Sequence, residues 1–212
     1  MEPNYFLTYL NESIRILQGI DVNELDKMVA IYKCLRKNNG RLFILGVGGS
    51  CANASHAVND FRKLVGIETY TPTDNASELT ARTNDEGWHT VFVEWLKISH
   101  LNSNDVLLIL SVGGGNKEKN ISANIVEALV YAKTVGAKIT GIVSRDGGHT
   151  KQVADACILI PPFEPHITPH AEEMQGVVWH AIVNHPELSL ARKNLPLKIE
   201  IQILNRPEPS KK

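Results

Sequence analysis

The sequence predicts one α/β domain built on a doubly wound parallel sheet. Short apolar segments, each followed by a turn and then by a segment whose apolar residues have helical spacing, recur at least three times. The run 105–110 (Asp-Val-Leu-Leu-Ile-Leu) is apolar after its first residue, as is typical of a parallel strand covered on both faces. Ligands of such sheets bind beyond the carboxyl ends of the strands, where the glycine-rich turns at 46–50 and 111–116 are expected to lie.

Two amphipathic helices are predicted before the sheet. Apolar residues recur with helical spacing in 4–18 and again in 22–35, with a break at Gly19. Acidic and basic residues balance in this region, whereas a DNA-binding helical head is expected to be basic. We therefore interpret residues 1–40 as helices that pack on the domain and at an oligomer interface.

The central motif is a strand, a turn and a helix at 41–60. Residues 42–45 are apolar and predict a short buried strand, three glycines then form a tight turn, and Ser50 occupies the expected helix N-cap. His56 and Asp60 follow on one face of the helix, because they are four residues apart. Free backbone N–H groups at a helix start attract anions. The motif therefore predicts a phosphate seat close to an imidazole and a carboxylate.

The next elements alternate in the same way. A short strand is predicted at 68–70, followed by a helix at 77–83 with Ser77 as its N-cap. Turn residues at 84–88 end this helix, and helical spacing returns at 91–98.

After the strand at 105–110, a helix is expected through Ile125, Leu129 and Ala132. Buried strands are predicted at 137–143 and 156–160. A last helix should run from about Pro169 to Val183, because His185-Pro186 ends it. We assign residues 41–190 to the α/β domain and 191–212 to a C-terminal extension. Within the extension, 195–204 alternates apolar and polar residues, which fits either an edge strand or an extended oligomer arm.

The composition argues against several classes of protein. The net charge is −1 and no basic block occurs beyond the lysine pair at the chain end, so neither nucleic acid nor an anionic membrane is an expected partner. No apolar run is long enough to span a membrane, and the first residues lack a signal-peptide pattern. The cysteines at 34, 51 and 157 are odd in number and widely spaced, which predicts reduced thiols and a cytoplasmic protein.

Several of these motifs together resemble a known family. The glycine-serine turn with His56, the Asn84-Asp85 pair, the Ser111-led loop, the segment 145–148 (Arg-Asp-Gly-Gly) and His180 occur in the same order in phosphoheptose isomerases. These are sugar-isomerase (SIS) domain proteins that interconvert sedoheptulose 7-phosphate and a heptose 7-phosphate. The resemblance covers about residues 4–183. It implies a homotetramer of flavodoxin-like subunits with active sites between subunits, and a zinc ion, one per subunit.

The resemblance also implies roles for particular residues. The family's metal ligands fall on His56, Asp60, Glu172 and His180, and its catalytic base and acid fall on Asp60 and His180. Glu172 remains open at this point, because Glu173 and Gln175 stand nearby and a small shift in alignment exchanges them. Asp60 and Glu172 are also expected to contact the substrate.

Further substrate contacts are implied for three short segments. The sugar-contacting pair corresponds to Asn84 and Asp85, which the pattern alone explains equally as turn residues. The two phosphate loops correspond to Val47, Gly48, Gly49 and Ser50, and to Ser111, Val112, Gly113 and Asn116.

This chain departs from the family pattern at both ends of the expected site. The family's base is usually glutamate, and Asp60 is shorter by one methylene, about 1.5 Å. The family's glutamine corresponds to Glu172, which adds a negative ligand. In the second loop only Ser111 keeps a hydroxyl, so backbone N–H groups, Asn116 and Lys117 or Lys119 are expected to hold the phosphate.

The expected reaction is a metal-assisted aldose–ketose isomerisation through an enediol, which needs a base and an acid. The expected substrate and product are D-sedoheptulose 7-phosphate and D-glycero-D-manno-heptose 7-phosphate, in nucleotide-activated heptose biosynthesis. Two alternatives remain open: an isomerase of another sugar phosphate, or a phosphosugar-binding SIS protein that has lost proton-transfer geometry.

Overall fold

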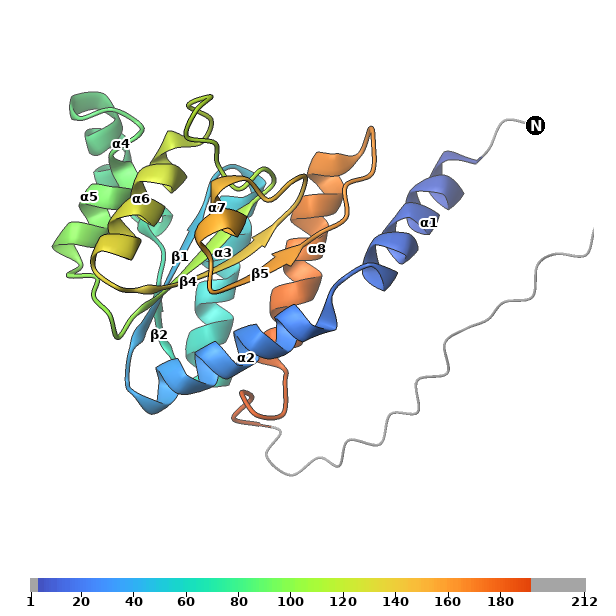
Figure 1. Cartoon of the computed structure of the whole chain (residues 1–212), viewed down its shortest axis with the longest axis horizontal. Helices are drawn as coiled ribbons and strands as arrows, with labels where there is room; N and C mark the ends of the chain where they lie inside the picture. The colour runs from blue at the N-terminus through green and yellow to red at the C-terminus, as the bar shows by residue number, and fades with distance from the viewer. Residues whose placement is uncertain (1–3, 192–212) are drawn as a thin grey trace, which may run out of the picture.

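The computed structural model describes residues 4–191, which form a five-stranded parallel sheet with helices on both faces (Figure 1). The strand order is β2-β1-β3-β4-β5, which is the flavodoxin-like order of a doubly wound sheet. The strands are β1 (Arg41–Gly46), β2 (Glu68–Tyr70), β3 (Val106–Ser111), β4 (Lys138–Val143) and β5 (Ala156–Leu159). The predicted fold class is confirmed.

Eight α-helices connect and cover the strands. They are α1 (Tyr5–Gln18), α2 (Val22–Lys37), α3 (Gly49–Asp60), α4 (Ala76–Asp85), α5 (Val91–Ile98), α6 (Ala123–Thr134), α7 (Gly148–Val153) and α8 (Ile167–Val183). Among the described residues, none of these helices has both the length and the apolar character needed to cross a bilayer.

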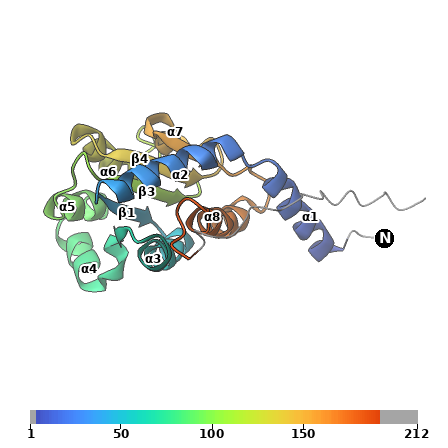
Figure 2. The ribbon, with the colours of Figure 1, turned by 90° about the horizontal axis from the view of Figure 1, so that it is seen from below.

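The two faces of the sheet carry separate apolar cores, because side chains alternate along each strand. Leu42 and Ile44 pack with residues of α2, α3 and α8, whereas Phe43 and Leu45 pack with residues of α5 and α6. Figure 2 shows α3 and α8 together on one face and α6 and α7 on the other. The contact between α3 and α8 matters for function, because it joins segments more than 100 residues apart in the chain.

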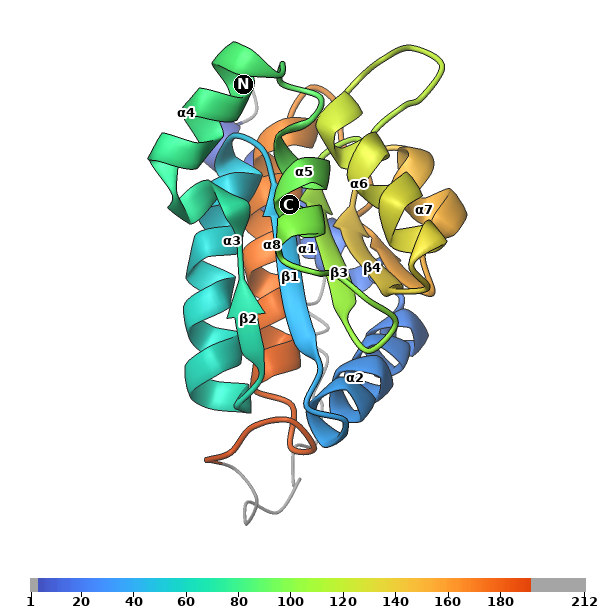
Figure 3. The ribbon, with the colours of Figure 1, turned by 90° about the vertical axis from the view of Figure 1, so that its left-hand side faces the viewer.

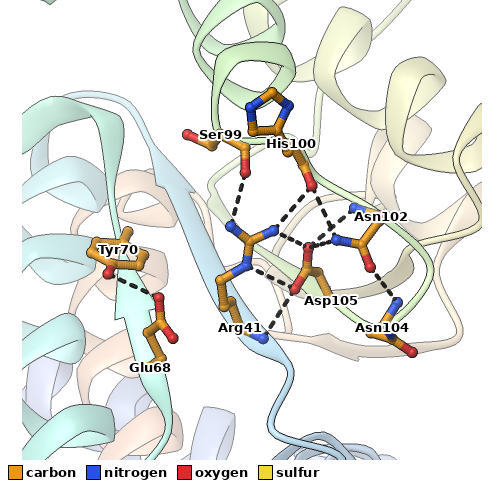
Figure 4. Close-up of polar contacts among 8 residues, drawn as sticks. All are labelled: Arg41, Glu68, Tyr70, Ser99, His100, Asn102, Asn104 and Asp105. Carbon is orange, nitrogen blue, oxygen red and sulfur yellow. Dashed lines mark hydrogen bonds and ion pairs between the residues drawn. The ribbon is translucent and has the colours of Figure 1, made fainter.

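A buried ion pair holds the starts of β1 and β3 together (Figure 4). Asp105 is 2% exposed, and its carboxylate accepts hydrogen bonds from the backbone N–H of Arg41 (3.0 Å) and from the Arg41 guanidinium (2.7 Å). The same guanidinium donates to the carbonyl groups of Ser99 and His100. The pairing thus satisfies the buried carboxylate fully, as a buried charge requires.

Two predicted helix caps are wrong. The N-cap of α3 is Gly48, with φ +64°, so Ser50 lies inside the helix rather than at its cap. The N-cap of α4 is Asn75, whose side chain accepts from the backbone N–H of Glu78 (3.2 Å), rather than Ser77. Asn and Ser are about equally good caps, so local preference alone does not choose between them.

Other boundaries also differ from the prediction. Helix α4 continues to Asp85, so the expected turn at 84–88 begins within the last turn of a helix. Helix α7 was not predicted, because it is short and its sequence has few apolar residues. Helix α3 continues into a π-helical turn at Phe61–Val65. The predicted strand or arm at 195–204 lies outside the described residues.

The two N-terminal helices behave differently. Helix α2 packs against the domain through Met28 and Tyr32, which are fully buried. Helix α1 extends away from the sheet (Figure 1) and exposes most of its apolar side chains. The most exposed of these are Phe6 at 74% and Leu7 at 62%.

Candidate functional site

The two predicted glycine-rich turns open onto one cavity of about 690 Å³. They follow β1 and β3, which are neighbours in the sheet, and the chain leaves these two strands toward opposite edges. In Figure 3 the strands run upward, so the turns lie at the upper end of the sheet, as does α4. A doubly wound sheet binds its ligands at such a switch point.

Most of the predicted loop residues line this cavity. They are Val47, Ser50, Ser111, Val112, Gly113 and Asn116. Of the two lysines proposed as phosphate contacts, Lys119 lines the cavity and Lys117 is not part of its lining. The predicted residues Gly48 and Gly49 lie beside the lining and form the start of α3.

Arg145 also lines the cavity, and the sequence pattern had not given it a role. It follows β4 closely and has φ +56°, a backbone conformation that is uncommon for a residue other than glycine. Together with Lys119 it places positive charge at the carboxyl edge of the sheet, which suits a phosphate group. A charged residue just after a buried strand was the available signal.

The second glycine loop has its shape because it packs against another glycine pair. A Cβ on Gly114 would overlap the carbonyl oxygen of Gly147, and Gly114 has φ +68°. The carbonyl of Gly114 also accepts from the backbone N–H (2.9 Å) and the hydroxyl (2.7 Å) of Thr150. Ser111 Oγ accepts from the N–H of Gly114 (3.0 Å) and therefore fixes the turn from its other end. This packing explains why the loop carries glycines rather than hydroxyl side chains.

A cluster of two imidazoles and one carboxylate lies between α3 and α8. His56, Asp60 and His180 each offer one ligand atom, and these atoms lie within 4.8 Å of one another. His180 Nε2 is 3.7 Å from Asp60 Oδ2. Asp60 Oδ1 accepts a hydrogen bond from the Asn59 side chain (2.8 Å), so its second oxygen is the one that faces the imidazole.

The hydrogen bonds fix how His180 can act. Its Nδ1 is 2.7 Å from the carbonyl oxygen of Gly176, and only an N–H can donate to that oxygen. In the neutral ring, Nε2 therefore carries the lone pair, on the side that faces Asp60. The fully buried Trp179 backs the cluster, with ring centroids 3.5 Å from His180 and 4.8 Å from His56.

Glu172 is not part of this cluster. Its carboxylate lies against Gly49, close enough that a Cβ at Gly49 would overlap it. A negative charge is favourable there, since Gly49 begins α3 and the N-terminus of a helix carries partial positive charge. Asn53 anchors this part of α8 by donating to the Glu172 carbonyl (2.8 Å) and to Gln175 Oε1 (3.1 Å). The structure thus brings together three of the four residues predicted to bind metal.

Asn84 and Asp85 lie at the end of α4, where both are exposed. The Asn84 amide donates to Asp85 Oδ1 (2.7 Å), and neither residue belongs to the cavity lining.

The donor set of the cluster suits a zinc ion. Imidazole nitrogen and carboxylate oxygen are common zinc ligands, and three protein ligands with one open position are typical of catalytic sites. The Gly176 carbonyl holds His180 with Nε2 free to ligate, which is the kind of outer contact that metal-binding histidines usually have.

The sequence and the fold both match known proteins. A family model described as "SIS domain" matches residues 8–144. A phosphoheptose isomerase of Helicobacter pylori (strain Shi470) is 29% identical over 163 residues, which cover 74% of this chain and 80% of that protein. One from a Nitratiruptor species is 31% identical over 151 residues, which cover 69% of this chain and 75% of that protein. The structure of phosphoheptose isomerase from Neisseria gonorrhoeae superposes with a TM-score of 0.72 at 26% identity, and the match covers 84% of this chain and 94% of that one.

Proposed function

The chain belongs to the SIS domain family and, within it, to the phosphoheptose isomerases, and we propose that its substrate is D-sedoheptulose 7-phosphate. It is a phosphosugar isomerase of the aldose–ketose type. The proposed product is D-glycero-D-manno-heptose 7-phosphate, an intermediate of nucleotide-activated heptose biosynthesis. The observation that carries the proposal is the His56, Asp60 and His180 cluster in a chain whose glycine loops open onto a cationic cavity.

The phosphate is held at the carboxyl edge of the sheet. Backbone N–H groups at the start of α3, the Ser50 and Ser111 hydroxyls, and the cations of Arg145 and Lys119 supply the contacts. This arrangement fixes one end of the sugar and leaves its carbonyl end to reach the proton-transfer groups.

Asp60 acts as the base in this proposal. Its carboxylate removes a proton from C1 of the ketose while the protonated His180 Nε2 gives a proton to O2, which yields the enediol. His180 then takes the proton from O1, and Asp60 returns its proton to C2, which leaves the aldehyde at C1. Each group ends in the state in which it began, as a catalyst must.

His56, Asp60 and His180 are the proposed ligands of one zinc ion per subunit, and Glu172 is the fourth residue proposed to contact metal or substrate. A bound zinc ion supplies Lewis-acid polarisation of the sugar carbonyl. The position of Glu172 at Gly49 means that it joins the cluster only if its side chain moves away from the start of α3. Asn84 and Asp85 remain proposed sugar contacts.

We propose a homotetramer whose active sites lie between subunits. Along α3, Asp60 lies ten residues after Ser50, a separation of about 15 Å. The eight bonds from C1 of a heptose to its terminal phosphorus add up to about 12 Å at most, taking about 1.5 Å per bond. A substrate held at the cavity of one subunit is therefore better placed to meet the cluster of a neighbouring subunit. The exposed apolar face of α1 offers a surface for that assembly.

The proposed location is the cytoplasm. The three cysteines are unpaired in the structure, as is usual in a reducing compartment.

The first experiment is to assay metal-stripped and zinc-reloaded protein with sedoheptulose 7-phosphate and to follow the sugar by NMR. We expect zinc to restore turnover and an aldoheptose 7-phosphate to accumulate. If no turnover occurs but the sugar phosphate raises the melting temperature, the chain binds phosphosugars without isomerising this one. If neither occurs, another sugar phosphate is the substrate.

A further inference from the structure

A second cluster of potential metal ligands lies at the other end of α8. Glu12 of α1 and His166 and His170 at the start of α8 each offer one ligand atom, and these atoms lie within 4.8 Å of one another. Glu12 Oε2 is 2.9 Å from His166 Nδ1 and 2.9 Å from His170 Nε2. His170 and His180 are ten residues apart, which is about 15 Å along the helix. The cluster is thus separate from the proposed active site.

The surroundings of His170 are unusual for an imidazole that binds only protons. His170 is 1% exposed, and its Nδ1 has no hydrogen-bond partner among the described residues. Glu173 Oε2 lies 3.5 Å from this Nδ1, so carboxylates flank both ring nitrogens. A neutral imidazole has one N–H and one lone pair. In either tautomer, one lone pair therefore faces a carboxylate.

A divalent cation would resolve this arrangement. With the cation on Nε2, the Nδ1–H points to Glu173, which gives the carboxylate–histidine–metal order common around bound metals. Glu173 is itself held by the Tyr9 hydroxyl, which donates to its Oε1 (2.7 Å). Burial and this hydrogen bond raise the pKa of Tyr9 to about 12, so the hydroxyl remains a donor at neutral pH.

We propose that Glu12, His166 and His170 form a second site for a zinc-class divalent ion, separate from the proposed catalytic cluster. Two histidines four residues apart on a helix can bind one ion from the same face. The carboxylate of Glu12 completes a set of three protein ligands that leaves one position for water. The hydrogen bonds from His170 and His166 lower the pKa of Glu12, so this ligand is ionised at neutral pH.

The site joins two elements that otherwise have few polar links. Helix α1 contributes Glu12 and Tyr9, and α8 contributes both histidines and Glu173. The Tyr9 ring packs on both histidines, with centroids 4.2 Å from His170 and 5.3 Å from His166. A bound ion would therefore hold α1, with its exposed apolar face, at a fixed angle to the domain.

The test counts metal bound to the full chain, prepared without a histidine tag and stripped with a chelator. Zinc equivalents per chain are measured after dialysis, in the wild type and in His56→Gln, which removes a ligand of the other cluster. We expect His56→Gln to keep one equivalent, and the double variants His56→Gln/Glu12→Gln and His56→Gln/His166→Gln to lose it. Zinc should also raise the melting temperature of His56→Gln but not that of either double variant.

Matched controls are His89→Gln and Glu127→Gln, made in the same His56→Gln background at exposed positions on other elements. Both should retain the ion. Glu173→Gln should weaken zinc affinity by about 10- to 100-fold, since it removes only the outer partner of His170. The proposal is wrong if His56→Gln binds no zinc, or if the double variants bind as much zinc as the controls. Neither result depends on whether the chain isomerises a heptose phosphate.

Discussion

At the scale of single residues, the position of Asp60 decides what the proposed site can do. It is the last residue of α3 and is 8% exposed, with one oxygen held by Asn59 and the other facing His180. A short side chain suffices here because α8 brings the imidazole toward it. The shorter base is thus compatible with an active site, provided that the substrate reaches this end of α3.

Replacing Asp60 tests its role as the base. Asp60→Asn should lower kcat by about 10²- to 10⁴-fold, because the amide cannot accept the C1 proton. The melting temperature should change little, and Asp60→Glu should recover part of the activity, since it restores a carboxylate. Steady-state kinetics with zinc-loaded protein measure both, with the exposed Asp26→Asn as control. Full turnover by metal-loaded Asp60→Asn would exclude this role.

At the scale of elements, the loop after β3 and the loop after β4 form one unit. The carbonyls of Gly114 and Gly115 accept from the first N–H groups of α7, Thr150 (2.9 Å) and His149 (2.7 Å). The loop that shapes the phosphate cavity is thus positioned by a helix that the sequence did not predict. The glycines are there because two backbones meet closely.

An alanine at Gly114 should therefore be costly. The positive φ alone should lower the free energy of unfolding by about 1–2 kcal/mol, and overlap with the Gly147 carbonyl adds to this. Gly113→Ala is the matched comparison, because its Cβ would meet only Arg145 Cδ at 3.9 Å. Urea denaturation of both variants should show a clear loss for Gly114→Ala and little change for Gly113→Ala. Equal losses would contradict this account of the loop.

The link between β4 and the start of β5 should respond to acid. Burial acts to raise the pKa of Asp155, but hydrogen bonds from the Lys138 ammonium (2.7 Å) and the Ile139 N–H (2.9 Å) outweigh it, so the pKa is below its ordinary value of 3.8. A depressed folded-state pKa contributes stability that is complete above the unfolded pKa and is lost as the pH falls through the folded one.

The stability difference between the wild type and Asp155→Asn should thus be constant from neutral pH down to about pH 5 and should shrink below about pH 4. Free energies of unfolding at a series of pH values measure this. Asp26→Asn, on the exposed side of α2, should show no such loss in the acid range. A difference that grew on acidification would reverse the sign argued here.

At the scale of the whole molecule, α1 is the element that the described chain leaves least covered. Its apolar residues are exposed: Tyr5, Phe6, Leu7, Leu10, Ile14 and Leu17. A contiguous apolar surface of this kind on a helix indicates a contact with another chain. The proposed tetramer would cover it and would bring a cavity and a cluster from different subunits together.

Charge placed on this surface should break the assembly. We expect the wild type to sediment as a tetramer, and Phe6→Glu/Leu10→Glu to sediment as a smaller species with reduced turnover. Asn11→Glu adds the same kind of charge at an exposed polar position of α1 and should remain tetrameric. Analytical ultracentrifugation decides between these outcomes. A double variant that stays tetrameric would place the interface elsewhere.

The sequence was informative wherever burial repeats with a local period. The strand at 68–70 and the helix at 91–98 have the predicted bounds, because each is bordered by turn residues and has a clear pattern. Helix caps were less certain, since Asn75 and Ser77 are both good caps and only the folded backbone selects one. Helix α7 was missed because its stabilising contacts come from the glycine loop rather than from its own apolar face.

The sequence by itself determined the doubly wound sheet, the two glycine turns at its carboxyl edge, and the placing of His56 and Asp60 on one helix face. Local periodicity and spacing are sufficient for these features. Only the tertiary structure decided that Arg145 lines the cavity, that Glu172 lies at Gly49, and that Glu12 meets two histidines. These contacts join segments distant in the chain, and they depend on how helices pack across the sheet, which no local pattern encodes.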